Sequence, residues 1–141
     1  MEKRFKTTRK YQSSIAMTDE VRDGLKYTKT HEWIKLVGNK ATIGITDHAQ
    51  HELTDIVFVE LPTVGKDIKK GEELCVVESV KSVSEVYAPV SGKITTVNNK
   101  LDDSPELINS SPYDDGWLVE IELKDTAEIS MLIDPTAYKK L

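Results

Sequence analysis

The sequence predicts a mostly β fold of short antiparallel strands, with a few short helices that include one at the C-terminus. Runs rich in β-branched and aromatic residues recur along the chain. Turn-forming residues separate these runs at intervals of roughly 8 to 12 residues, a spacing typical of a β-sandwich or barrel. The length of 141 residues suits a single core, and no low-complexity run divides it.

The first strands are expected at residues 25–28, 30–36 and 41–45. The second of these alternates partly between apolar and polar residues, and Gly38 and Asn39 supply the turn before the third. A short helix is expected over residues 46–53, because Thr46 is a suitable capping residue at its start. The chain therefore opens with antiparallel strands and one helix.

Two further strands are expected in the middle of the chain, at residues 55–61 and 93–97, and Pro62 ends the first of them. The segments 65–68 and 92–94 resemble each other, since each begins with Gly-Lys and leads into a strand. The two segments lie on either side of the stretch that contains Lys81.

The last third of the chain is expected to combine loop, strand and helix. Residues 104–113 are predicted to be a loop with one helical turn, and residues 117–123 alternate as a strand does. Residues 127–133 are apolar at helical spacing. A final helix over residues 136–140 would be capped by Asp134 and Pro135.

Between residues 74 and 88 the pattern is ambiguous. The apolar runs 74–77 and 86–88 fit two strands, which would place Lys81 near the tip between them. A three-residue repeat of valine also suits one face of a helix: Val77, Val80, Val83 and Val86. Strands are preferred because valine and serine are poor residues for a helix interior. A type I turn needs no glycine, so the hairpin remains possible without one.

Composition argues against several classes of protein. The net charge of −5 and pI near 5.2 disfavour nucleic acid or an anionic membrane as the main partner. No apolar run approaches the roughly 18 residues that span a bilayer. Cys75 is the only cysteine, which excludes an intrachain disulfide and fits a reducing compartment. Its apolar neighbours favour a core side chain over a nucleophile.

The N-terminus differs in charge from the rest. Residues 1–16 carry five basic side chains and one acidic side chain, and they contain no apolar segment of the secretory type. The expected division is a basic, flexible extension at residues 1–24 and a folded domain at 25–141. A short mitochondrial presequence over residues 1–16 is the alternative, and Met17 could be a natural start.

The residues around Lys81 resemble the lipoyl-attachment site of the biotinyl/lipoyl carrier family. Val80 and Ser82 flank the lysine where biotin carriers usually place methionine, which favours lipoate. Six pieces in order resemble the H-protein family of the glycine cleavage system: residues 27–33, 44–50, 57–62, 77–81, 105–109 and 116–118. The resemblance covers nearly all of residues 25–140.

This resemblance implies a lipoyl-domain-like barrel-sandwich hybrid and a non-catalytic carrier. Lipoate would be joined by an amide to Lys81, within a site that includes Glu78, Ser79 and Val80, and would serve as a swinging arm. The implied partners are glycine decarboxylase (P protein), aminomethyltransferase (T protein), dihydrolipoyl dehydrogenase (L protein) and lipoate-attaching enzymes. A cytoplasmic monomer is expected, or a mitochondrial matrix protein if residues 1–16 are a presequence.

The resemblance also implies a sheltering site for the aminomethyl group that the arm carries. Its expected lining residues are Thr30, Glu32 and Glu85, although glutamates on a surface need no special role.

Two other functions stay open. A lipoyl-relay module that donates lipoyl groups to other enzymes would have the same Lys81 site. An independent enzyme would need Cys75 or the histidines, and no Ser/His/Asp set or phosphate loop accompanies them. No metal is expected, because His48 and His51 could share a helix face but His31 is a poor third ligand.

Overall fold

The computed structural model describes residues 15, 16 and 18–141. Its elements follow one another in this order: β1 (Lys26–Tyr27), β2 (Glu32–Val37), β3 (Lys40–Ile45), α1 (Asp47–Leu53), β4 (Ile56–Glu60), β5 (Asp67–Ile68), β6 (Glu73–Ser79), β7 (Val83–Tyr87), β8 (Gly92–Val97), α2 (Lys100–Asp103), α3 (Leu107–Ser110), β9 (Val119–Leu123), the 3-10 helix η2 (Thr126–Met131) and α4 (Pro135–Lys139).

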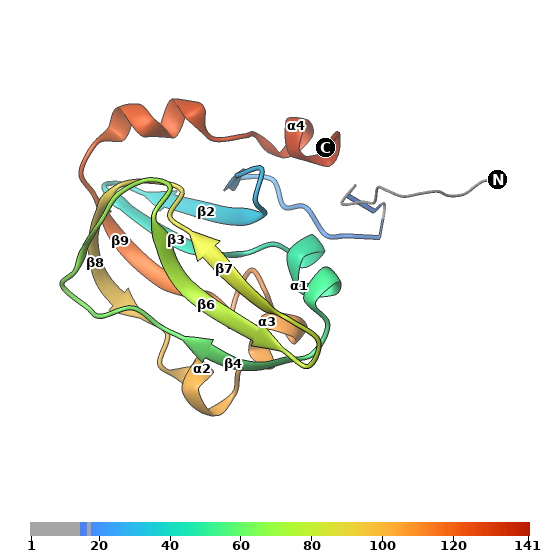
Figure 1. The fold of residues 1–141 in the computed structure, drawn as a ribbon. Helices are drawn as coiled ribbons and strands as arrows, with labels where there is room; N and C mark the ends of the chain where they lie inside the picture. The colour runs from blue at the N-terminus through green and yellow to red at the C-terminus, as the bar shows by residue number, and fades with distance from the viewer. Residues whose placement is uncertain (1–14, 17) are drawn as a thin grey trace.

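The strands form two antiparallel sheets (Figure 1). One has six strands in the order β1-β2-β3-β9-β8-β5, and the other has three in the order β4-β6-β7. The predicted fold class, mostly β with short helices and one at the C-terminus, is confirmed. The echoing segments around the centre of the chain pair with each other, since Ile68 of β5 lies opposite Gly92 of β8.

The hairpin expected around Lys81 is confirmed as β6 and β7. The burial of the four valines shows why this segment forms two strands rather than a helix. Val77 and Val86 point into the core, with 0% and 2% of their surface exposed. Val80 and Val83 are 67% and 60% exposed. A helix would place all four on one side, whereas two strands and a turn bury only the pair that the core can cover.

The main core lies between the two sheets. Ile34, Ile43 and Ile121 come from the larger sheet, while Val59 and Val77 come from the smaller one, and all are buried. Burying side chains of this kind stabilises the folded state by roughly 1.5 to 3 kcal/mol each before entropy is counted. The sheet that carries Lys81 is therefore fixed from behind by a continuous apolar layer.

A second core is aromatic and fastens the C-terminal helix. Tyr138 of α4 stacks on Tyr27 of β1 with ring centroids 4.4 Å apart. Trp33 and Tyr113 belong to the same cluster. Gly44 makes room for Trp33, because a Cβ there would lie 2.6 Å from the indole ring. α4 is thus held against β1, close to the β1–β2 turn.

Helical turns outside the sheets differ in part from expectation. The turn expected within residues 104–113 is confirmed as α3. Of the apolar stretch 127–133, only the part up to Met131 lies in η2, because Leu132 is extended and Ile133 forms a bridge with Tyr27. α2, which packs near β4, has no counterpart among the expected elements. Its four residues carry a single buried apolar side chain, Leu101, so the sequence offers no periodic pattern from which to predict it.

Part of the segment expected to be an extension lies against the folded domain. The Arg22 guanidinium forms two hydrogen bonds of 2.9 Å with Asp114 and lies over the ring of Tyr113. Val21 packs on the aromatic cluster. The expectations for residues 1–14 and for Met17 fall outside the described residues. Within the described residues, no helix combines the length and the apolar character needed to cross a membrane.

Candidate functional site

Lys81 occupies the tip of the β6–β7 hairpin, in a turn that its serine neighbours stabilise. The Ser79 hydroxyl oxygen accepts hydrogen bonds from the backbone N–H groups of Lys81 and Ser82, at 3.2 and 3.0 Å. The Ser79 N–H donates to the Ser82 carbonyl at 2.8 Å. Neither Val80 nor Lys81 has a positive φ, so the turn needs no glycine, as expected. The Lys81 side chain is exposed.

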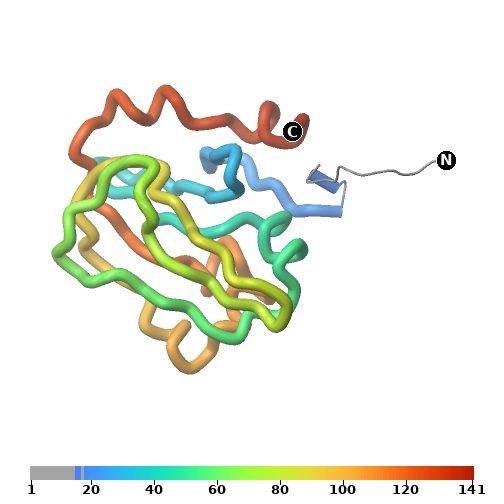
Figure 2. Tube along the Cα trace, in the orientation of Figure 1, coloured from blue at the N-terminus to red at the C-terminus, as the bar shows by residue number. Residues whose placement is uncertain are grey.

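The tip is anchored to the body of the molecule. The Val80 N–H donates to the Asp55 carbonyl at 3.0 Å, just before β4. Figure 2 shows this turn at the rim of the molecule, beside the chain that joins α1 to β4. Glu78 lies opposite Val83 in the ladder and is half-buried. All four residues of the expected attachment site, from Glu78 to Lys81, are therefore on one rigid projection.

A cavity of about 490 Å³ lies at the other end of β7. Its walls come from four parts of the chain: the β1–β2 turn, Lys70 and Gly71 between β5 and β6, the end of β7 with the residues that follow it, and the end of η2 with the residues after it. Tyr87, Met131 and Ile133 contribute apolar surface. Thr30 and Glu32, two of the three residues expected to shelter the arm's cargo, also line the cavity.

Glu32 is the one acidic side chain that lines this cavity, and it is 2% exposed. One carboxylate oxygen accepts hydrogen bonds of 2.5 Å from the hydroxyls of Thr28 and Thr30. The other accepts from the backbone N–H of Tyr87 at 3.2 Å. Burial raises the pKa of Glu32, and these hydrogen bonds offset only part of the rise. Among the described residues it has no ion-pair partner.

Glu85, the third expected residue, does not line the cavity. It lies on β7 opposite Val76 and is exposed. Because side chains alternate along a strand, Glu85 shares a face of β7 with Tyr87, which does line the cavity. Glu85 thus lies between the tip and the cavity along the strand.

Tyr87, Met131 and Ile133 had no sequence signal as lining residues. Ile133 reaches the site through a two-way backbone bridge to Tyr27, with both N···O distances 2.8 Å. This contact joins residues more than a hundred positions apart.

The raised pKa of Glu32 predicts a pH dependence of stability. An acid whose pKa is higher in the folded than in the unfolded state favours folding while it is protonated, and this contribution is lost as pH rises through the folded pKa. Relative to Glu32→Gln, wild-type protein should therefore lose stability as pH rises from about 4.5, the ordinary value, toward neutrality. Denaturant unfolding of both proteins at several pH values measures this difference. A pH-independent difference would contradict it.

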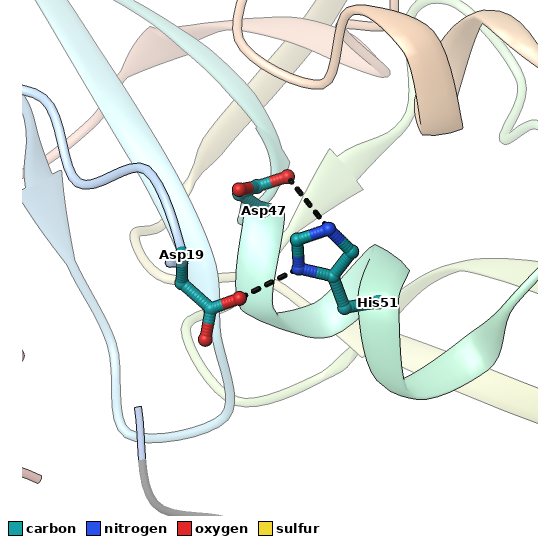
Figure 3. A group of neighbouring side chains, drawn as sticks. All are labelled: Asp19, Asp47 and His51. Carbon is teal, nitrogen blue, oxygen red and sulfur yellow. Dashed lines mark hydrogen bonds and ion pairs between the residues drawn. The ribbon is translucent and has the colours of Figure 1, made fainter. Parts of the chain in front are cut away.

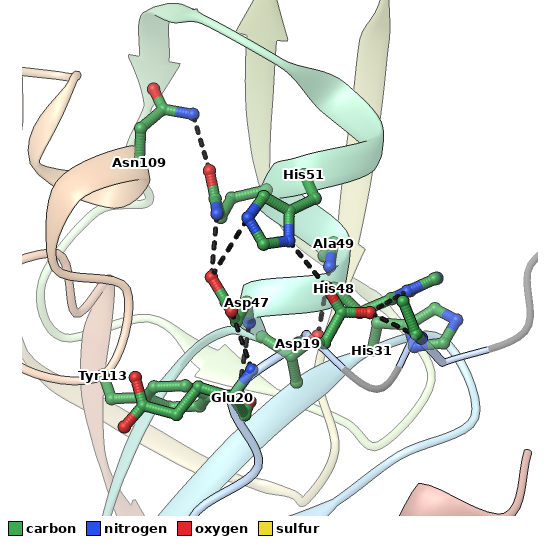
Figure 4. A network of polar contacts seen from close by, with 12 residues as sticks. Asp19, Glu20, His31, Asp47, His48, Ala49, His51, Asn109 and Tyr113 are labelled. Carbon is green, nitrogen blue, oxygen red and sulfur yellow. Dashed lines mark hydrogen bonds and ion pairs between the residues drawn. The ribbon is translucent and has the colours of Figure 1, made fainter.

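The histidines lie away from this cavity, around Asp19. His48 and His51 of α1 both place Nδ1 against the Asp19 carboxylate, at 2.9 and 2.6 Å. Burial would raise the pKa of Asp19, but the hydrogen bonds from His51 and His48 outweigh it and the pKa is lowered. Figure 4 shows this network joining the N-terminal segment to α1. It fixes the segment before β1 to the domain.

Asp19, Asp47 and His51 also have the spacing of metal ligands, since their ligand atoms lie within 4.8 Å of one another (Figure 3). The imidazole of His51 already lies between the two carboxylates, with Nε2 3.9 Å from Asp47. His31 contacts Tyr138 instead, at 2.7 Å. Burial, followed by the charge of His48, lowers the pKa of His31 to about 4. These contacts give the histidines a structural role.

Cys75 is buried in β6 with 4% of its surface exposed, so its expected place in the core is confirmed. Burial raises the pKa of its thiol. A neutral, enclosed thiol is a poor nucleophile.

Comparison with known proteins agrees with this architecture. The family model for glycine cleavage H-protein matches residues 25–141. The glycine cleavage system H protein of Endomicrobium trichonymphae is 56% identical over 117 residues, which are 83% of this chain and 94% of that protein. The glycine cleavage system H protein 2, mitochondrial, of Arabidopsis thaliana is 50% identical over 128 residues, 91% of this chain and 79% of that protein.

A solved structure has the same fold. The crystal structure of a glycine cleavage system H protein from Mycobacterium marinum superposes with a TM-score of 0.74 at 35% identity, covering 84% of this chain and 95% of that one. The expected resemblance is thereby confirmed over the folded domain. The chain belongs to the glycine cleavage H-protein family, whose members are carriers rather than enzymes.

Proposed function

We propose that this protein carries lipoate on Lys81 and transports the aminomethyl group of glycine from the P protein to the T protein, with the L protein as the third partner. The observation that carries the proposal is the placement of Lys81: an exposed amine on a hairpin tip that the core holds rigid from behind. An amide at this nitrogen would remove the ammonium charge without disturbing a buried contact. The residues present therefore fit the cofactor.

Lipoate would supply a disulfide that opens to two thiols and can take up the aminomethyl group. The residues of this chain hold the attachment point in place. Ser79 stabilises the turn by its hydrogen bonds, the backbone of Val80 bonds to Asp55, and Glu78 continues β6 beneath the turn. A mobile arm on a rigid base can reach several enzymes in succession.

The cavity at the far end of β7 is proposed as the shelter for the loaded arm. From Val83 to Tyr87 the strand spans about 13 Å at 3.3 Å per residue. This is comparable with an extended lysine side chain joined to an eight-carbon acid. Glu32 supports the assignment, because a buried carboxylate without a cation is costly and a cationic amine would compensate it. Thr30 positions Glu32 by its hydrogen bond, and Glu85 lies on the way along β7.

We also propose a monomer, a folded domain at residues 25–141 and a cytoplasmic location. The word mitochondrial in the name of the Arabidopsis relative is the reason to keep a matrix location as the alternative. A fluorescent reporter fused to residues 1–16 and expressed in eukaryotic cells separates the two, since import would support the presequence.

The lipoylated protein should stimulate release of CO2 from glycine by purified glycine decarboxylase, with saturation as its concentration rises. The matched control is the same protein made without lipoate, which should stimulate little. A lipoylated protein without effect on the decarboxylase, but able to pass its lipoyl group to a second lipoyl domain, would overturn the proposal in favour of a relay module.

A further inference from the structure

The outer face of the three-stranded sheet, beside Lys81, has an unusual composition. The ladder aligns Phe58 of β4 with Glu78 of β6 and Val83 of β7. Residues aligned across a sheet point to the same side of it. The adjacent row along the strands, Val59 with Val77, is buried and so points into the core. The row that contains Phe58 and Val83 therefore faces outward.

Four exposed apolar side chains surround the tip. Phe58 is 53% exposed, Val83 60%, Val80 67% and Val57 51%. Val57 is turned outward by an irregularity in the ladder between Ile56 and Phe58. Single exposed apolar residues are ordinary, but a contiguous group beside a functional residue indicates a contact surface.

Acidic residues border this apolar group, and basic residues are rare around it. The next row that faces outward along the strands places Glu60 of β4 and Glu85 of β7 on either side of Val76 of β6. Asp55 precedes β4. Across residues 52–61 and 72–89, the sole basic residue is Lys81 itself. A partner that covers this face would gain most from an apolar centre with lysine or arginine at its edge.

We propose that this face, formed by Val57, Phe58, Val80 and Val83 with the carboxylates Asp55, Glu60 and Glu85, is the docking surface for the lipoate-attaching enzyme that acylates Lys81. The enzyme presents an apolar patch edged by lysine or arginine. The proposal rests on the lipoyl-carrier function proposed above.

The acylating enzyme is the occupant because of the length of the group it must reach. Before acylation, Lys81 offers only its own side chain, so an active site that encloses its amine must come into contact with the tip and with the residues beside it. Enzymes that act on the loaded arm can stay farther away by the length of the acyl chain. The exposed apolar side chains lie beside the tip, so the acylating enzyme must cover them, whereas enzymes that act on the loaded arm need not.

The test measures lipoylation of Lys81 by a purified lipoate-protein ligase with lipoate and ATP, followed by intact mass. Val83→Ser is compared with Val37→Ser, a valine that is 66% exposed on β2 of the other sheet. Val83→Ser and Phe58→Ser should each raise the KM for this protein about five- to tenfold with kcat nearly unchanged. Val37→Ser should behave as wild type.

Charge variants make the test independent of apolar packing. Glu60→Gln with Glu85→Gln should raise KM severalfold and weaken its dependence on salt. Glu122→Gln, an exposed glutamate on β9, is the matched control and should change neither. If a serine variant unfolds at a lower temperature than wild type, the docking surface is tested by the KM values of the charge variants alone.

Equal KM values for wild type, Val83→Ser, Phe58→Ser and the glutamine double variant would overturn the docking surface. In that case lipoylation of the wild type would still support the carrier function. Failure of the wild type itself to accept lipoate would instead remove the carrier function, and the docking surface with it.

Discussion

Replacing Lys81 by arginine should abolish the lipoyl adduct. Arginine retains a positive charge and a similar length, but its guanidinium stays protonated at every accessible pH and offers no free amine to an activated acid. Intact-mass spectrometry of protein made in lipoate-supplied cells should show one adduct on the wild type and none on Lys81→Arg. The fold should be unaffected, because the Lys81 side chain is exposed.

Lys93→Arg is the matched control for this experiment. Lys93 is exposed as Lys81 is, but it lies on β8, opposite Glu122 and away from the hairpin tip. Its variant should keep the full adduct. A lipoyl adduct that persisted on Lys81→Arg would move the attachment site to another lysine and would leave the hairpin tip without a function.

The hairpin was predictable because its information is local. The apolar runs on either side of Lys81, and the weakness of valine and serine as helix formers, indicate two strands, and the buried Val77 and Val86 agree. The six-piece resemblance added the prediction that Lys81 is the residue that carries lipoate. Neither source required knowledge of which distant strands become neighbours.

The cavity proposed as the shelter was only partly predictable because it depends on distant contacts. Thr30 and Glu32 were found through resemblance, but the cavity also needs Met131 and Ile133, which the bridge between Tyr27 and Ile133 brings into place. Likewise, nothing in the residues near Asp19 indicates that it binds His48 and His51 of α1. Such contacts depend on which distant segments of the chain become neighbours in the fold, and the local periodicity of apolar residues does not contain this information.

Glu85 shows the complementary limit of reasoning from resemblance. The sequence groups it with Thr30 and Glu32, but β7 places it on the exposed outer face, two residues before the end that reaches the cavity. Its carboxylate is therefore open to solvent, where screening weakens any interaction with a cation. Glu32, which is enclosed and hydrogen-bonded, is therefore expected to interact with a cationic amine more strongly than Glu85 does.

This contrast leads to the second large effect: Glu32→Gln should shorten the lifetime of the loaded carrier while leaving lipoylation of Lys81 unchanged. A charge-assisted hydrogen bond contributes roughly 1.5 to 3 kcal/mol, and each 1.4 kcal/mol corresponds to a factor of ten. Spontaneous loss of the aminomethyl group, measured as formaldehyde released without the T protein, should therefore accelerate on the order of tenfold or more.

Glu85→Gln is the matched control, since it removes the same charge from an exposed position on β7, in the other sheet, and should change the decay rate much less. The glutamine oxygen can still accept from Thr28 and Thr30, while its amide faces the N–H of Tyr87, so thermal unfolding of the variant must be measured alongside. If the loss is governed by this buried charge, added salt should affect the wild type only weakly. Equal decay rates for wild type and Glu32→Gln, with both proteins folded, would mean that the cavity does not shelter the arm through its carboxylate.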